Sequence, residues 1–215
     1  KLGANAILAV SLACARAGAA VQQRPLYQYI NQLLELKRAM CLPQPYFNGI
    51  NGGRHAENSL AFQEFFIVPK AKTFAEALRM GSETYHVLKK IIEKKYGNLA
   101  ANVGDEGGFA PPCKGAEDAL GLMMKAIAEA GYNGKIDVGM DCAASEFYKK
   151  GYYYLPKKMS KEELLGYYLK LINNYPLISI EDPFEQEDFE SFAALRKRSP
   201  VQVVGDDLLC TNVSR

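Results

Sequence analysis

Three apolar segments in the second half of the chain end in residues with carboxylate side chains. The segments are KIDVGMD, PLISIED and VQVVGDD, and their acids are Asp141, then Glu181 with Asp182, then Asp206 with Asp207. The carboxyl ends of parallel strands lie on one face of an α/β fold, where active sites are built. One such acid could equally cap a helix or pair with a lysine. Three in series favour a cation site, and oxygen ligands from separate strands suit Mg²⁺.

A fourth acid, Glu64, lies within the apolar segment AFQEFFIV. The two-residue period of a strand puts Phe62, Glu64 and Phe66 on one face, with Gln63 and Phe65 on the other. A buried carboxylate is costly without a partner. The segment therefore indicates either a functional acid or a structural ion pair with a lysine, and the sequence alone favours neither.

Two loops add further candidates. The segment GDEGGF places Asp105 and Glu106 between glycines, which let a backbone approach a ligand closely, and the carboxylate of Glu106 could exchange a proton. Taken alone, acids flanked by glycine more often make turns. His55 follows an NGG turn and could close over an anionic ligand, although a loop histidine is more often plain surface, and we interpret His86 as structural.

The elements that position these residues follow from hydrophobic periodicity. Residues 3–21 and 25–36 are predicted to be helices, the first packed in a core, and the prolines after Cys41 place a domain boundary near that residue. Strands are then predicted at 46–50 and 61–68. Three helical stretches, near 74–92, 120–127 and 164–172, alternate with the acid-ended segments. This alternation predicts a parallel sheet, either doubly wound or closed into a barrel, with the tyrosine run 152–154 as a packing strand or hairpin near the surface.

Composition narrows the class of protein. The chain has 215 residues, 48% hydrophobic and 23% charged, with a net charge of +2, as in ordinary globular proteins. It has no block of like charges, so we expect neither a nucleic-acid arm nor a polybasic membrane segment. Five cysteines without a CxxC pair indicate reduced thiols in a cytoplasmic protein rather than a zinc site.

The two ends of the chain carry a separate expectation. The most apolar stretch, Ala6 to Ala15, is far shorter than the roughly 20 residues that span a bilayer, so no transmembrane helix is expected. The chain opens on Lys1 within a helical pattern, without an initiator Met or signal segment, and stops at Arg215 just after a predicted strand. We therefore expect an internal piece of a longer protein.

Six segments, in their order and at their spacing, resemble the enolase family. They are KLGANAILAVSLACARA, FNGINGGRHAENSLAFQEFF, NVGDEGGFAP, GMDCAASEF, SIEDPF and VVGDDL. The resemblance implies that residues 1–40 end an α+β N-terminal domain. It implies that residues 41–215 begin a TIM-type barrel of the ββαα(βα)₆ kind, which would be incomplete here.

The resemblance also implies roles for individual residues. Asp141, Glu181 and Asp206 correspond to ligands of the tightly held Mg²⁺. Glu106 corresponds to the acid that helps the 3-hydroxide leave, with Glu64 beside it near the substrate. His55 corresponds to a mobile-loop histidine that closes on the substrate, and His55, Glu64, Glu181 and Asp206 are the expected substrate contacts.

The implied reaction is the reversible, Mg²⁺-dependent dehydration of 2-phosphoglycerate to phosphoenolpyruvate in glycolysis and gluconeogenesis, catalysed by a homodimeric lyase. The family's base lysine, a second active-site lysine and a phosphate-binding segment lie beyond VVGDDL, and a serine-bearing lid loop lies before residue 1. Arg54 and Glu57 stand where the family usually has small residues. Two other hypotheses are a superfamily enzyme acting on a different carboxylate and an enolase-like chain with a non-catalytic binding or surface-receptor role.

Overall fold

The computed structural model describes residues 2–36, 39–56 and 58–215 and divides the chain into two compact units, Lys1–Pro43 and Gln44–Arg215. The first unit contains α1 (Ala4–Val21) and α2 (Leu26–Leu33), which contact each other. Pro25 immediately precedes α2, where its fixed φ suits the start of a helix. Both predicted helices are present, although α2 ends three residues before the predicted Leu36.

The apolar side chains of α1 are exposed within this unit. Ala19 is its one buried residue among those described, while Ile7, Leu8 and Val10 are 58–64% exposed, so the prediction of a helix packed in a core is not met here. By length and composition alone, α1 is long and apolar enough to cross a membrane. The sequence-based exclusion of a membrane span considered only the ten residues from Ala6 to Ala15, whereas the helix is 18 residues long. This is weak evidence for a span, because core helices and signal sequences pass the same test.

The second unit is built on a five-stranded sheet with the order β1-β2-β3-β7-β8. Its strands are β1 (Phe47–Asn51), β2 (Glu64–Pro69), β3 (Ile136–Asp141), β7 (Leu177–Glu181) and β8 (Gln202–Val204). The three acid-ended strands β3, β7 and β8 are parallel, as predicted. β2 is antiparallel to both β1 and β3, in agreement with the implied ββαα(βα)₆ order. The sheet is open over the described residues, so the barrel is incomplete.

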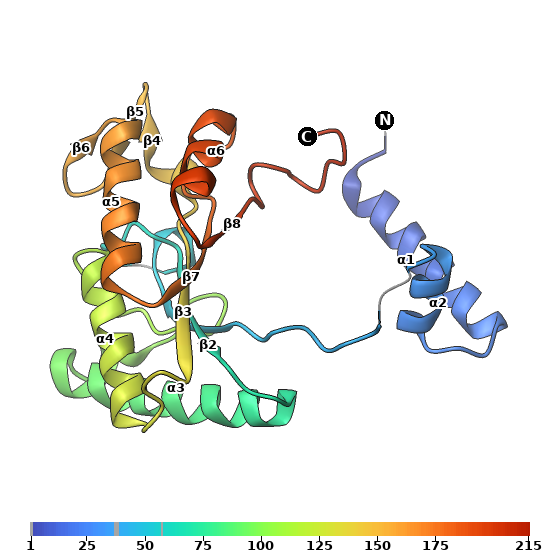
Figure 1. Ribbon diagram of the computed structural model, residues 1–215, viewed down its shortest axis with the longest axis horizontal. Helices are drawn as coiled ribbons and strands as arrows, with labels where there is room; N and C mark the ends of the chain where they lie inside the picture. The colour runs from blue at the N-terminus through green and yellow to red at the C-terminus, as the bar shows by residue number, and fades with distance from the viewer. Residues whose placement is uncertain (1, 37–38, 57) are drawn as a thin grey trace. The chain divides into compact units, whose positions relative to one another are not determined.

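Four helices accompany the sheet, and α4 and α5 lie along the same side of its strands (Figure 1). They are α3 (Phe74–Tyr96), α4 (Ala116–Glu129), α5 (Lys161–Asn174) and α6 (Phe189–Arg198). The predictions for α3, α4 and α5 are confirmed, whereas the periodicity did not reveal the short α6. Side-chain oxygens of Thr73, Ser160 and Asp188 accept backbone N–H bonds at the starts of α3, α5 and α6, and Ser160 forms a capping box with Glu163.

The core lies between the sheet and these helices. Phe65, Ile67, Val138 and Met140 of the central strands are fully buried, as is Leu120 of α4. Burial of each such side chain stabilises the folded state by about 1.5–3 kcal/mol relative to leaving it exposed. The core thereby holds the strands in a fixed register and determines where their carboxyl ends lie.

A second, three-stranded sheet follows β3. It consists of β4 (Tyr148–Lys149), β5 (Tyr152–Tyr154) and β6 (Lys158–Met159). Tyr153 is 1% exposed whereas Tyr152 and Tyr154 are exposed, which confirms the predicted amphipathic hairpin near the surface. The Tyr153 hydroxyl accepts the backbone N–H of Glu185, so this sheet packs beside the segment after β7.

Candidate active site

The acids of three strands meet at one edge of the main sheet. Asp141 of β3 is the register partner of Glu181 of β7, and Glu181 is in turn the partner of Val204 of β8. Asp206 follows Val204 by two residues. All six predicted site residues line one cavity of about 500 Å³, which is bounded by His55, Gln63, Glu64, Glu106, Asp141, Ala143, Glu146, Glu181, Asp206 and Asp207.

Asp141 is the most buried of the predicted metal ligands, with 8% of its surface exposed. One carboxylate oxygen accepts the Gln63 side-chain amide at 3.1 Å and the other accepts the Ala143 backbone N–H at 3.0 Å. Burial raises the pKa of Asp141 to about 6, and these hydrogen bonds act in the opposite direction. The two hydrogen bonds thus fix the orientation of the Asp141 carboxylate. They do not fully offset the cost of burying its negative charge.

Glu181 and Asp206 are more open to solvent. Glu181 is half-buried, and burial followed by repulsion from Asp141 raises its pKa to about 7. Asp206 is exposed on the turn after β8. Because several acids face one small space, a cation would lower the electrostatic cost of ionising them.

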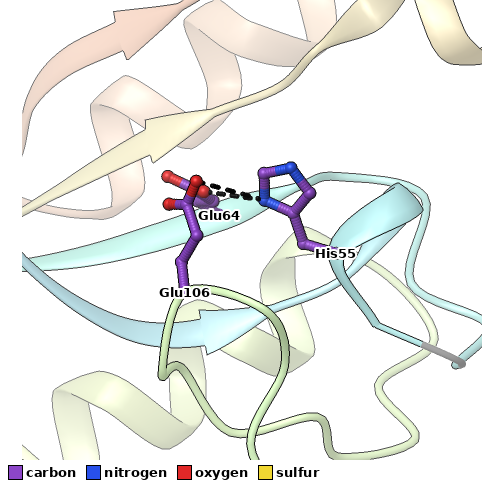
Figure 2. Close-up of side chains that lie close together, drawn as sticks. All are labelled: His55, Glu64 and Glu106. Carbon is purple, nitrogen blue, oxygen red and sulfur yellow. Dashed lines mark hydrogen bonds and ion pairs between the residues drawn. The ribbon is translucent and has the colours of Figure 1, made fainter.

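Across the cavity, the side chains of His55, Glu64 and Glu106 point toward one another from three different segments (Figure 2). The His55 Nδ1 atom lies 3.0 Å from Glu64 Oε1 and 3.8 Å from Glu106 Oε1. Burial, followed by the hydrogen bond and charge of Glu106, raises the pKa of Glu64 well above its usual range. The neutral form of Glu64 is therefore favoured at pH 7. No lysine pairs with Glu64 among the described residues, so the lysine ion pair considered for it is not found.

The loop that carries Glu106 is fastened to the end of β1 by Asn51, which is fully buried. The Asn51 side-chain oxygen accepts the Gly108 N–H at 2.8 Å, and the Asn51 N–H donates to the Phe109 carbonyl at 2.8 Å. A Cβ at position 108 would lie 2.6 Å from that side-chain oxygen, so only glycine fits there. The Asp105 N–H donates to the His55 carbonyl, which joins this loop to the histidine turn.

Comparison with known proteins identifies the family. A family model described as the enolase C-terminal TIM barrel domain matches residues 39–215. The chain belongs to the enolase family. It is 54% identical over 217 residues to the enolase of Methanocaldococcus jannaschii and 52% identical over 228 residues to the enolase of Solanum lycopersicum. Both matches cover all of this chain, which spans about half the length of these relatives.

Enolases are lyases that generally depend on Mg²⁺. Two groups of side chains in the cavity of this enolase-family chain could supply ligands for such an ion. Among the described residues, His55, Glu64 and Glu106 are the one group whose ligand atoms all lie within 4.8 Å of one another. The raised pKa of Glu64 makes it a poor ligand, and His55 offers a nitrogen rather than the oxygen donors that Mg²⁺ prefers. Asp141, Glu181 and Asp206 are less tightly grouped, but they offer carboxylate oxygens from separate strands, the donor type that Mg²⁺ prefers. The predicted trio therefore fits the ion better.

The structure also adds residues that sequence reasoning missed. Gln63 was assigned to the strand face opposite Glu64, yet it lines the cavity because β2 begins only at Glu64 and the alternation does not reach residue 63. Glu146 lines the same cavity from the 3-10 helix Ala144–Phe147 and forms an ion pair with Arg54. Glu57, the other departure from the family pattern, lies outside the described residues.

Proposed function

We propose that this chain supplies the metal-binding and acid-bearing part of an enolase, which reversibly dehydrates 2-phosphoglycerate to phosphoenolpyruvate in glycolysis and gluconeogenesis. The observation that carries the proposal is the single cavity that gathers all six of the predicted residues. Both curated relatives are named enolase and match the whole of this chain. The support therefore comes from geometry and family membership together.

Asp141, Glu181 and Asp206 would hold Mg²⁺ at the strand ends. When bound, the ion supplies positive charge that stabilises the second negative charge that develops on the substrate carboxylate during proton loss. Gln63 and the Ala143 N–H orient Asp141 for this task. The same acids favour a cation on this side of the cavity and disfavour an anionic occupant that arrives without one.

The opposite side of the cavity supplies the acid. In the direction of dehydration, the C3–O bond breaks and Glu106 donates its proton to the departing hydroxyl group, which leaves as water. The proton that Glu106 passes on comes from Glu64, whose raised pKa favours the neutral form at pH 7. His55 contacts the substrate from its turn, together with Glu64, Glu181 and Asp206. The base that removes the C2 proton is not assigned to a residue of this chain.

The remaining organisation follows the same proposal. Residues 1–40 belong to the end of an α+β N-terminal domain and residues 41–215 to the first part of the barrel. The protein is proposed to be a cytoplasmic homodimer whose partners are 2-phosphoglycerate and phosphoenolpyruvate rather than nucleic acid or membrane. The support is the family resemblance, the nearly balanced charge and the unpaired cysteines.

The test is Asp206→Ala in the full-length protein. Turnover, followed through the formation of phosphoenolpyruvate, and Mg²⁺ binding, followed by calorimetric titration, should be lost together. Retained turnover with wild-type Mg²⁺ affinity would contradict the assignment of Asp206. The protein without substitution serves as the reference, and absence of any turnover in that reference would contradict the enzyme itself.

A further inference from the structure

Asp182 follows Glu181 directly but does not line the cavity with the other acids. It is 2% exposed, and its backbone has φ +39°, a left-handed conformation that an aspartate adopts at a cost. A buried acid in a strained position beside a proposed metal ligand requires compensating contacts. Those contacts lead to each of the three strand ends.

The side chain of Asp182 accepts three consecutive backbone N–H groups of the turn after β8. One oxygen accepts from Asp207 at 2.8 Å and from Asp206 at 3.2 Å, and the other accepts from Leu208 at 3.3 Å. Charge-assisted bonds of this kind are stronger than neutral ones. The carboxylate thereby fixes the backbone that presents Asp206.

The main chain of Asp182 bonds to β8 and to the 3-10 helix that follows β3. Its N–H donates to the Val204 carbonyl of β8 at 3.0 Å, and its carbonyl accepts the Ala144 N–H, also at 3.0 Å. Ala144 follows Ala143, whose N–H orients the Asp141 carboxylate. Asp182 therefore contacts the segments that carry Asp141 and Asp206, and it is covalently joined to Glu181.

We infer that Asp182 is the positioning residue of the Mg²⁺ site: it does not bind the ion, but its five hydrogen bonds hold the three proposed ligands in place. The inference rests on the proposed function, because it takes Asp141, Glu181 and Asp206 as the ligands. Residues that orient metal ligands typically change metal affinity by about 10–100-fold when they are substituted. An effect of this size separates a positioning residue from an ordinary surface acid.

The decisive variant is Asp182→Asn in the full-length protein. An asparagine has nearly the same size, but it has one acceptor oxygen instead of two, so it cannot accept all three N–H groups. Mg²⁺ binding, measured by calorimetric titration without substrate, should weaken by about 10–100-fold. Asp182→Glu retains the negative charge but displaces the acceptors by one methylene, so a comparable loss there attributes the effect to position rather than to charge.

The matched control is Asp188→Asn. Asp188 also accepts a backbone N–H, that of Ser191 at the start of α6, but it does not line the cavity. This variant keeps an acceptor for the Ser191 N–H, so it should fold and keep wild-type Mg²⁺ affinity. Circular dichroism establishes that each variant is folded, and Asp182→Glu provides the test if Asp182→Asn does not fold.

The outcomes are distinguishable. If Asp206→Ala abolishes Mg²⁺ binding while folded Asp182→Asn and Asp182→Glu bind like the wild type, the positioning role is wrong and the metal site stands. If Asp206→Ala itself binds Mg²⁺ like the wild type, the proposed metal site is wrong and the role of Asp182 falls with it. Loss of affinity in both Asp182 variants but not in Asp188→Asn supports the inference.

Discussion

The two sides of the cavity are built in different ways. Asp141 and Glu181 lie at the ends of paired parallel strands, so the register of a buried sheet fixes their separation. His55 and Glu106 lie on loops, and backbone bonds and the buried Asn51 side chain hold those loops. Two of the three proposed metal ligands thus depend on the sheet, whereas on the acid side only Glu64 lies in a strand and the other two residues depend on a few polar contacts. The two sides should respond differently to substitution, pH and salt.

The largest expected effect is on the acid side alone. Glu106→Gln in the full-length protein cannot donate the proton, so kcat should fall by about 10²–10⁴-fold. Mg²⁺ affinity should stay unchanged, because the strand-end acids are intact. Steady-state kinetics and calorimetric titration measure the two quantities, and Glu129→Gln on the exposed face of α4 is the matched control. A parallel loss of Mg²⁺ affinity would show that the two sides are not independent.

A second effect concerns pH. Burial raises the pKa of Asp141 to about 6 and that of Glu181 to about 7, so between their ordinary values and these values the folded state binds more protons than the unfolded state. With divalent cations chelated, stability should therefore be highest at acidic pH and fall as pH rises from about 4 to about 7. Asp141 alone contributes a loss of about 3 kcal/mol.

Urea unfolding at several pH values measures this dependence. Added Mg²⁺ should reduce the part of the pH dependence of stability that Asp141 and Glu181 cause. Asp141→Asn should reduce this pH dependence without metal. The contribution of Glu64, whose pKa is raised by burial and by Glu106, should persist in the presence of Mg²⁺. A stability that rises from pH 4 to pH 7 in the chelated protein would contradict the assignment.

A third prediction tests how the acid side is held. Asn51→Ala leaves the buried Gly108 N–H without its acceptor, which should lower the free energy of unfolding by about 1–3 kcal/mol. Displacement of the Glu106 loop should also lower kcat while Mg²⁺ affinity is retained. Asn51→Asp keeps an acceptor oxygen and should recover part of the kcat. Equal kinetics in Asn51→Ala and the wild type would mean that the backbone bonds alone position the loop.

The sequence predicted the strand-end acids of the metal side more fully than the contacts that hold the loops of the acid side. Acids at the ends of apolar segments follow from strand period and parallel direction, both of which are local patterns. The hydrogen bond from the Gly108 N–H to Asn51 joins residues 57 positions apart, and the bond from Gln63 to Asp141 joins residues 78 positions apart. No local pattern encodes such contacts, so NGG was interpreted only as a turn. The antiparallel direction of β2 was likewise available from family resemblance and not from periodicity.

The smallest expected effect concerns Arg54, which stands where the family usually has a small residue. Its side chain is 76% exposed and pairs with Glu146 on the cavity rim, so it links the turn of His55 to the segment after β3. Exposed ion pairs are weak and are screened by salt, so Arg54→Ser should raise KM only about two- to fivefold at low salt and leave kcat and Mg²⁺ affinity unchanged. Glu146→Gln should have the same effect, and the double variant should be no worse than either single one. Additive losses would mean that the two residues act separately on the substrate, and the ion pair between Arg54 and Glu146 would then have no energetic role.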